Sequence, residues 1–137
     1  MLFFYFYLIS FSLIGYGLLA NKVLSINANN IGYLGLLGIS VLTILSYASS
    51  IFISHGYVFN LVLIIFGIVL FVIFFKNITN MKKELTYYLF TFLILSIFIL
   101  VGKNHDDFSY YHFPYMYLLT EFSHPLGIGQ LNNGFRN

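Results

Sequence analysis

The sequence predicts an all-α integral membrane protein, a helical bundle of four transmembrane helices followed by an extracytoplasmic loop with short juxtamembrane helices. The first observation behind this prediction is composition. Of the 137 residues, 60% are hydrophobic and 7% are charged, and the mean hydropathy is +0.90. Such a chain lacks the polar surface that covers a water-soluble globule. The second observation is that four long stretches contain no Asp, Glu, Lys or Arg. We therefore expect membrane lipid to surround most of the chain.

The uncharged stretches cover residues 1–20, 31–53, 57–75 and 85–101. At about 1.5 Å of rise per helical residue they approach or exceed the roughly 30 Å hydrocarbon thickness of a bilayer, the last one only with its flanking residues. Residues 1–101 are thus predicted to form one transmembrane region. Gly32, Gly35 and Gly38 lie in the second stretch, where we expect helix backbones to pack closely.

Lysine positions predict the orientation, because Lys and Arg accumulate in short cytoplasmic loops. The loops after the first and third stretches carry Lys22, Lys76, Lys82 and Lys83. The turn Ser54–Gly56 has neither Lys nor Arg, and the N-terminus has no basic residue to hold it inside. Both are predicted to face outward. The segment 102–137 then also lies on the extracytoplasmic side.

Two classes of site are excluded by composition. The chain has no cysteine, which rules out disulfides, thiolate metal sites and cysteine nucleophiles. The net charge is only +2 and the basic residues are scattered, so no nucleic-acid partner is expected.

The composition changes abruptly at Gly102. Half of the formal charges, three of the four histidines and both prolines follow it. The charged residues there are Lys103, Asp106, Asp107, Glu121 and Arg136. Because proline is tolerated in a first helical turn but breaks a helix interior, we predict a short turn to Phe113 and a helix from Pro114 to Phe122. Its aromatic face would lie on the membrane surface.

Three readings of Asp106 and Asp107 remain open. One of them is expected to cap the following helix, because an N-cap carboxylate accepts unpaired backbone N–H groups. The pair is also a candidate ligand set for a divalent cation such as Mg²⁺ or Mn²⁺, with His105 and His112 nearby. Adjacent carboxylates repel each other, which favours a functional role for the second acid.

The string from His105 to Pro114, with Gly127, Gly129, Asn132, Gly134 and Phe135 downstream, resembles the external loop of the C-type membrane glycosyltransferases. In that family an acidic residue of the first large external loop works beside a sugar linked to a polyprenyl phosphate. It deprotonates the acceptor hydroxyl or helps to hold a divalent ion. Asp106 and Asp107 stand at the matching positions. Four predicted spans precede the loop here, whereas family members commonly place it after the first helix.

The resemblance implies a hexosyltransferase of the bacterial inner membrane, with Asp106 and Asp107 as catalytic residues. The candidate substrate-binding residues are His105, Tyr110, His112, Lys103 and Arg136. Lys103 and Arg136 are candidates for the leaving phosphate. Because such transferases need further helices and the chain ends within a polar loop, we expect an N-terminal fragment of a longer parent, inactive by itself.

A second function class remains open at this stage. A small nonenzymatic membrane subunit, or a fragment of a transporter, would use the external acids to bind a cation or to cap a helix. Against a transporter, the four uncharged stretches contain no Asp, Glu, Lys or Arg, whereas ion pathways usually place such a residue within the membrane.

Overall fold

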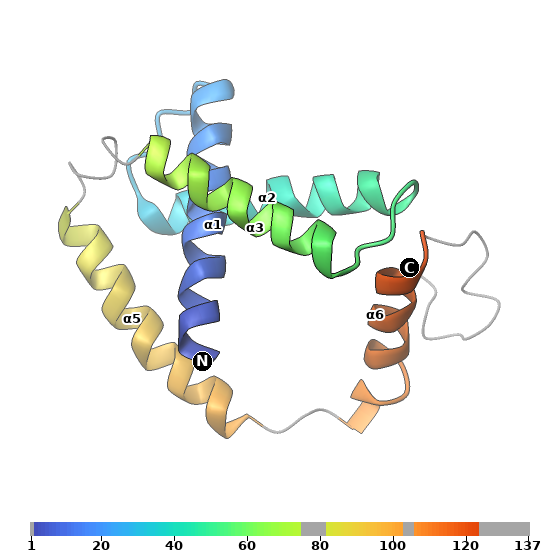
Figure 1. The fold of residues 1–137 in the computed structure, drawn as a ribbon. Coiled ribbons are helices and arrows are strands. Elements are labelled where there is room, and N and C mark those ends of the chain that lie inside the picture. Colours follow the sequence, from blue (N-terminus) through green and yellow to red (C-terminus); the bar gives the residue numbers. More distant parts are fainter. Residues whose placement is uncertain (1, 75–81, 103–105, 124–137) are drawn as a thin grey trace. The chain divides into compact units, whose positions relative to one another are not determined.

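The computed structural model describes residues 2–74, 82–102 and 106–123 (Figure 1). The described residues fold into five α-helices and one 3₁₀ turn, which confirms the all-α prediction. The elements are α1 (Leu2–Val23), α2 (Ile31–Ser50), α3 (Tyr57–Ile73), α5 (Lys82–Val101), η1 (Asp106–Phe108) and α6 (His112–Glu121). The chain forms two compact units, one of residues 1–44 and 62–102 and one of residues 45–61 and 103–137, so their boundary runs through α2 and α3.

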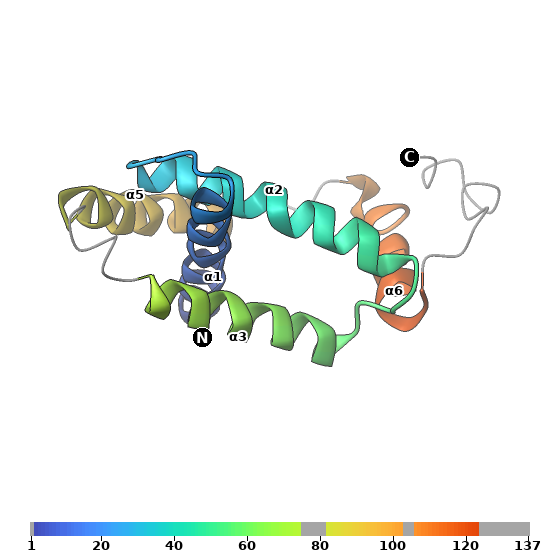
Figure 2. The same cartoon turned by 90° about the horizontal axis from the view of Figure 1, so that it is seen from above.

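In the first unit, α1 passes between α2 and α3, which both cross it steeply (Figures 1 and 2). Glycines allow these crossings. A Cβ atom on Gly17 would collide with the backbone carbonyl of Leu34 in α2, and one on Gly15 would collide with that of Gly67 in α3. Gly38 meets the carbonyl of Leu13 in the same way. The expected close packing of the second stretch is therefore confirmed at Gly38.

Gly35 behaves differently, because nothing lies within 4 Å of a Cβ atom built on it. A Cβ atom built on Gly32 would meet only the side-chain oxygen of Asn30, two residues earlier, at 3.1 Å. The expectation of close helix contact is therefore wrong for these two glycines. Only one of the three faces the crossing helix.

The buried core of this unit lies where four helix ends meet. Ile14 and Leu18 of α1 pack with Ile31 and Leu34 of α2, and all four are at most 4% exposed. Partly buried residues of the end of α3, the start of α5 and the α1–α2 loop cover this cluster, namely Phe71, Phe74, Leu85, Tyr88 and Ala28. Lys22 lies over the ring of Phe74, with its ammonium nitrogen 5.2 Å from the ring centre.

The α1–α2 connection is held by side-chain amides. The backbone N–H of Ala28 donates to Asn21 Oδ1 at 2.8 Å, and Asn21 Nδ2 donates to the Ala28 carbonyl at 3.3 Å. Ser25 and Asn27 adopt positive φ angles of 52° and 57°, which turns the chain back. These contacts and backbone angles fix the conformation of the loop that leads into α2.

The first turn of α2 is capped from two sides. Asn30 Oδ1 accepts the N–H of Tyr33 at 3.0 Å, and Glu84 Oε2 of α5 accepts the N–H of Ile31 at 3.1 Å. These N–H groups have no partner within the helix, and a carboxylate also matches the positive end of the helix dipole. Glu84 thus ties the start of α5 to the start of α2.

Two of the described helices, not the four predicted, are both long and apolar enough to cross a membrane, Phe3–Val23 and Ile31–Ser50. The helix α3 has 17 residues, about 26 Å, and α5 begins with Lys82, Lys83 and Glu84, which shortens its apolar part. Two apolar helices this close to the N-terminus indicate membrane association or a signal sequence.

Gly38→Ala is expected to lower stability by roughly 1–3 kcal/mol, the usual range for overpacking, because the new methyl group meets the rigid Leu13 carbonyl. Gly35→Ala is the matched control on the same helix. It should be neutral or slightly stabilising, since alanine favours the helix. Thermal unfolding in detergent measures both. Equal stability of the two variants would show that the α1–α2 crossing is not tight.

Glu84→Ala is expected to lower stability by roughly 1–2 kcal/mol, because the N–H of Ile31 loses a charged acceptor. Glu84→Gln keeps an acceptor oxygen and should lose less. Unfolding by heat or by SDS gives the comparison, with Glu121→Ala, an exposed acid at the end of α6, as control. If Glu84→Ala behaves like Glu121→Ala, the cap contributes nothing.

Candidate functional site

The acid pair forms the first two residues of η1. Asp106 and Asp107 are both exposed. The Asp107 carbonyl accepts the N–H groups of Tyr110 at 3.2 Å and Tyr111 at 3.0 Å, which fixes the turn that leads into α6. With three residues per 3₁₀ turn, successive side chains point about 120° apart.

The helix α6 begins at His112, two residues before the predicted start, and Pro114 lies in its first turn, where a missing N–H costs nothing. Its N-cap residue is Tyr111, which makes no side-chain capping hydrogen bond. The expectation that an acid of the pair caps this helix is therefore wrong. The acids belong to the separate turn before it.

The other described candidates lie in the same short segment. Tyr110 and His112 are exposed, and His112 opens α6. The rings of Phe108 and Phe113 lie 6.3 Å apart and join η1 to the first turn of α6. Segment 106–112 thus presents four of the predicted site residues on one exposed stretch. Lys103, His105 and Arg136 lie outside the described residues.

The fit to a divalent cation is incomplete. Among the described residues, no group of three or more His, Cys, Asp or Glu side chains is arranged to hold a metal ion. The acid pair supplies only two carboxylates, and Mg²⁺ or Mn²⁺ binds a fuller oxygen shell. The described part of the chain alone does not form such a site.

A second polar cluster surrounds His55, to which sequence reasoning assigned no role. The backbone N–H of His55 donates to the Leu119 carbonyl of α6 at 2.7 Å, and Asn60 Nδ2 donates to the His55 carbonyl at 2.7 Å. The imidazole stacks on Phe59 with ring centres 4.5 Å apart and planes 7° apart. Burial lowers the pKa of His55. The only sequence signal was a histidine in a short turn between apolar helices.

The imidazole also contacts Ser49, with His55 Nε2 2.9 Å from Ser49 Oγ. The Ser49 hydroxyl is also within hydrogen-bond distance of two carbonyls of the preceding turn, that of Leu45 at 2.7 Å and that of Ser46 at 3.3 Å. Which of Ser49 Oγ and His55 Nε2 donates depends on the tautomer of the ring.

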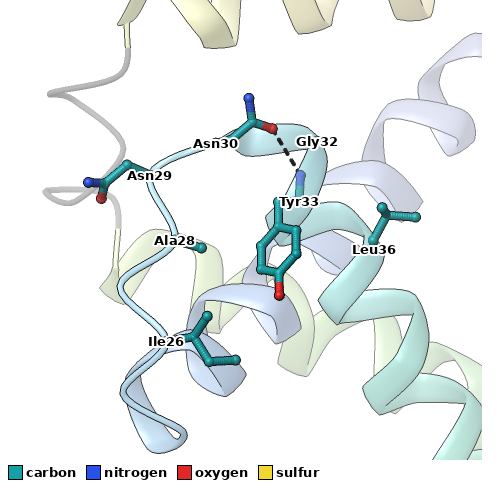
Figure 3. Close-up of a pocket in the computed structure, with 7 residues that line it drawn as sticks. All are labelled: Ile26, Ala28, Asn29, Asn30, Gly32, Tyr33 and Leu36. Atoms are coloured by element: carbon teal, nitrogen blue, oxygen red, sulfur yellow. Dashed lines mark hydrogen bonds between the residues drawn. The ribbon is translucent and has the colours of Figure 1, made fainter.

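The first unit carries a groove of about 680 Å³ beside the start of α2 (Figure 3). Its lining residues are Ile26, Ala28, Asn29, Asn30, Gly32, Tyr33 and Leu36. The Asn30 amide oxygen at its edge is bonded to the backbone of Tyr33. No predicted site residue and no carboxylate or histidine lines it. The groove does not offer acid–base chemistry.

No curated protein and no solved structure matches the sequence. A family model matches residues 1–135. This match includes both the helical region and the acidic turn, so one family domain contains the two. The comparisons provide membership of a family but no activity. The chain belongs to the family described as Domain of unknown function (DUF8201).

Proposed function

We propose that this chain is the N-terminal part of a membrane glycosyltransferase, which transfers a sugar from a polyprenyl-phosphate-linked donor to an acceptor on the extracytoplasmic side. The observation that carries the proposal is the exposed acid pair on η1, directly before an aromatic helix. Phe113, Met116 and Tyr117 of α6 are all more than half exposed. Such a helix suits the membrane surface, where the headgroup of a lipid-linked sugar is presented.

The reaction needs one base. A carboxylate of Asp106 or Asp107 takes the proton of the acceptor hydroxyl. At the same time the oxygen of that hydroxyl bonds to the anomeric carbon of the sugar. The bond from that carbon to the phosphate oxygen breaks, and the polyprenyl phosphate leaves with the electron pair. Tyr110 and His112 would bind sugar hydroxyls beside the turn. Lys103, His105 and Arg136 remain candidates for binding the lipid-linked sugar donor. Of these, Lys103 and Arg136 would bind its phosphate.

Two contacts support the proposed orientation. The predicted outward turn Ser54–Gly56 is bonded to α6, which follows the acid pair. The predicted cytoplasmic ends of α1 and α3 share one core with the starts of α2 and α5. In this proposal α3 and α5 also cross the membrane, at the short end of the length range. The chain then lies in a bacterial inner membrane with its N-terminus outside.

Asp106→Asn and Asp107→Asn in the full-length protein test the catalytic assignment. We expect at least one to lower sugar transfer by about 10²–10⁴-fold, the usual contribution of a general base. Transfer to acceptor in membranes containing the lipid-linked donor is the measurement. Glu121→Gln, which neutralises another exposed acid of the same segment, should keep full transfer. Full transfer in both Asp variants would exclude the pair from catalysis.

The orientation is tested by single cysteines in a chain that has none of its own. Ser109 and Asn29 are both exposed, one after η1 and one in the α1–α2 loop. We expect a membrane-impermeant maleimide to label Ser109→Cys in intact cells and Asn29→Cys only after permeabilisation. The reverse pattern, or equal labelling of both in intact cells, would contradict the topology.

A further inference from the structure

The end of α6 is bound to the α2–α3 turn. The last carbonyls of a helix have no partner within it. In α6, the Leu118 carbonyl accepts the N–H of Phe122 at 2.9 Å, and the Leu119 carbonyl accepts the N–H of His55 at 2.7 Å. A Cβ atom on Gly56 would lie 3.4 Å from the Thr120 carbonyl. The turn therefore covers the C-terminal end of this helix.

His55 connects the three chain segments that meet at this point. Its carbonyl accepts from Asn60 at the start of α3, its ring stacks on Phe59, and its Nε2 is hydrogen-bonded to Ser49 at the end of α2. Its backbone N–H reaches α6. Both main-chain polar groups and one ring nitrogen are thus used in joining elements.

We infer that His55 is a positioning residue, which clamps the end of α6 to the α2–α3 turn and thereby fixes the helix that follows the acid pair. All contacts of the clamp lie within the second unit, residues 45–61 and 103–137. Its consequence for catalysis rests on the proposed function.

The clamp acts on the acid pair through α6. The helix has ten residues and is about 15 Å long. At its far end Phe113 packs against Phe108 of η1, the residue after Asp107. A short helix held at one end and packed against η1 at the other restricts where the carboxylates lie.

Burial disfavours the charged form of the imidazole in the clamp. Burial lowers the pKa of His55, whereas a histidine in water has a pKa of about 6.5. As the pH falls through that value, the undocked form takes up a proton first, so docking is complete above it and weakens below it. The other titratable side chains near these helix ends are Tyr47, Tyr57, Tyr117 and Glu121. Desolvation, not one of these groups, causes the shift.

Crosslinking of Gly56→Cys with Thr120→Cys in lipid vesicles tests the inference, because these 137 residues contain no cysteine. A short bismaleimide should join the pair efficiently. His55→Ala should lower the ratio of crosslinked to free chains about fivefold, which corresponds to the ~1 kcal/mol of one side-chain hydrogen bond. His55→Gln retains an N–H donor near the Nε2 position and should restore much of the yield.

Ser49→Ala should reproduce the loss, and combining it with His55→Ala should add little, since both remove the same bond. Ser40→Ala is the matched control, because Ser40 Oγ also bonds the carbonyl four residues earlier, at 3.0 Å, but has no histidine partner. It should leave the ratio unchanged. Between pH 7.5 and 5.5 the ratio should fall for the parent relative to His55→Gln, which shares the same thiol chemistry.

An unchanged ratio in His55→Ala overturns the inference, as does an equal fall in Ser40→Ala. Sugar transfer is not part of this readout. Inactive or active Asp106→Asn and Asp107→Asn proteins bear on the proposed function alone, and the crosslink bears on the clamp alone.

Discussion

The first unit depends on how closely α1 can approach two helices at once. Gly15 and Gly17 are two residues apart, which places them about 200° apart around the helix axis, on nearly opposite faces. One therefore meets α3 and the other α2. Each glycine removes the side chain that would hold the two backbones apart, so dispersion contacts between backbones contribute to packing at both crossings. The burial of the two long apolar helices agrees with this central place of α1. Of the most apolar part of α1, 44% is buried, whereas the corresponding share for α2 is 17%.

The sequence was sufficient for the fold class and for where the helices lie, because uncharged stretches and lysines mark them directly. The sequence predicted the ends of the helices less exactly. The second stretch extends to Ile53, but the helix stops at Ser50, where the hydroxyls of Ser49 and Ser50 bond carbonyls of the preceding turn. The stretch 85–101 omitted Lys82, Lys83 and Glu84, yet the helix includes them. Charge marked the end of an apolar run there, not the end of the helix.

The candidate site was predictable only in its local part. The acid pair and its proline-marked helix are adjacent in the chain, so their order predicted a turn followed by a helix near the observed start. The partner of that helix was not predictable, because His55 and Leu119 are far apart in sequence and joined by backbone atoms, which leave no residue signature. Likewise, nothing in the sequence around Glu84 indicates that it caps α2.

Those two contacts follow one rule. A chain with ten formal charges has few charged side chains that can form tertiary contacts. Most of its backbone N–H and carbonyl groups are hydrogen-bonded within helices. The unsatisfied groups are at helix ends, the N–H of Ile31 at the start of α2 and the carbonyl of Leu119 at the end of α6. A carboxylate meets the first and a backbone N–H meets the second, as the opposite polarities of the two ends require. In the described residues these two helix termini therefore carry polar tertiary contacts, beside Tyr16, whose hydroxyl donates to the Leu63 carbonyl of α3 at 2.8 Å within the apolar packing.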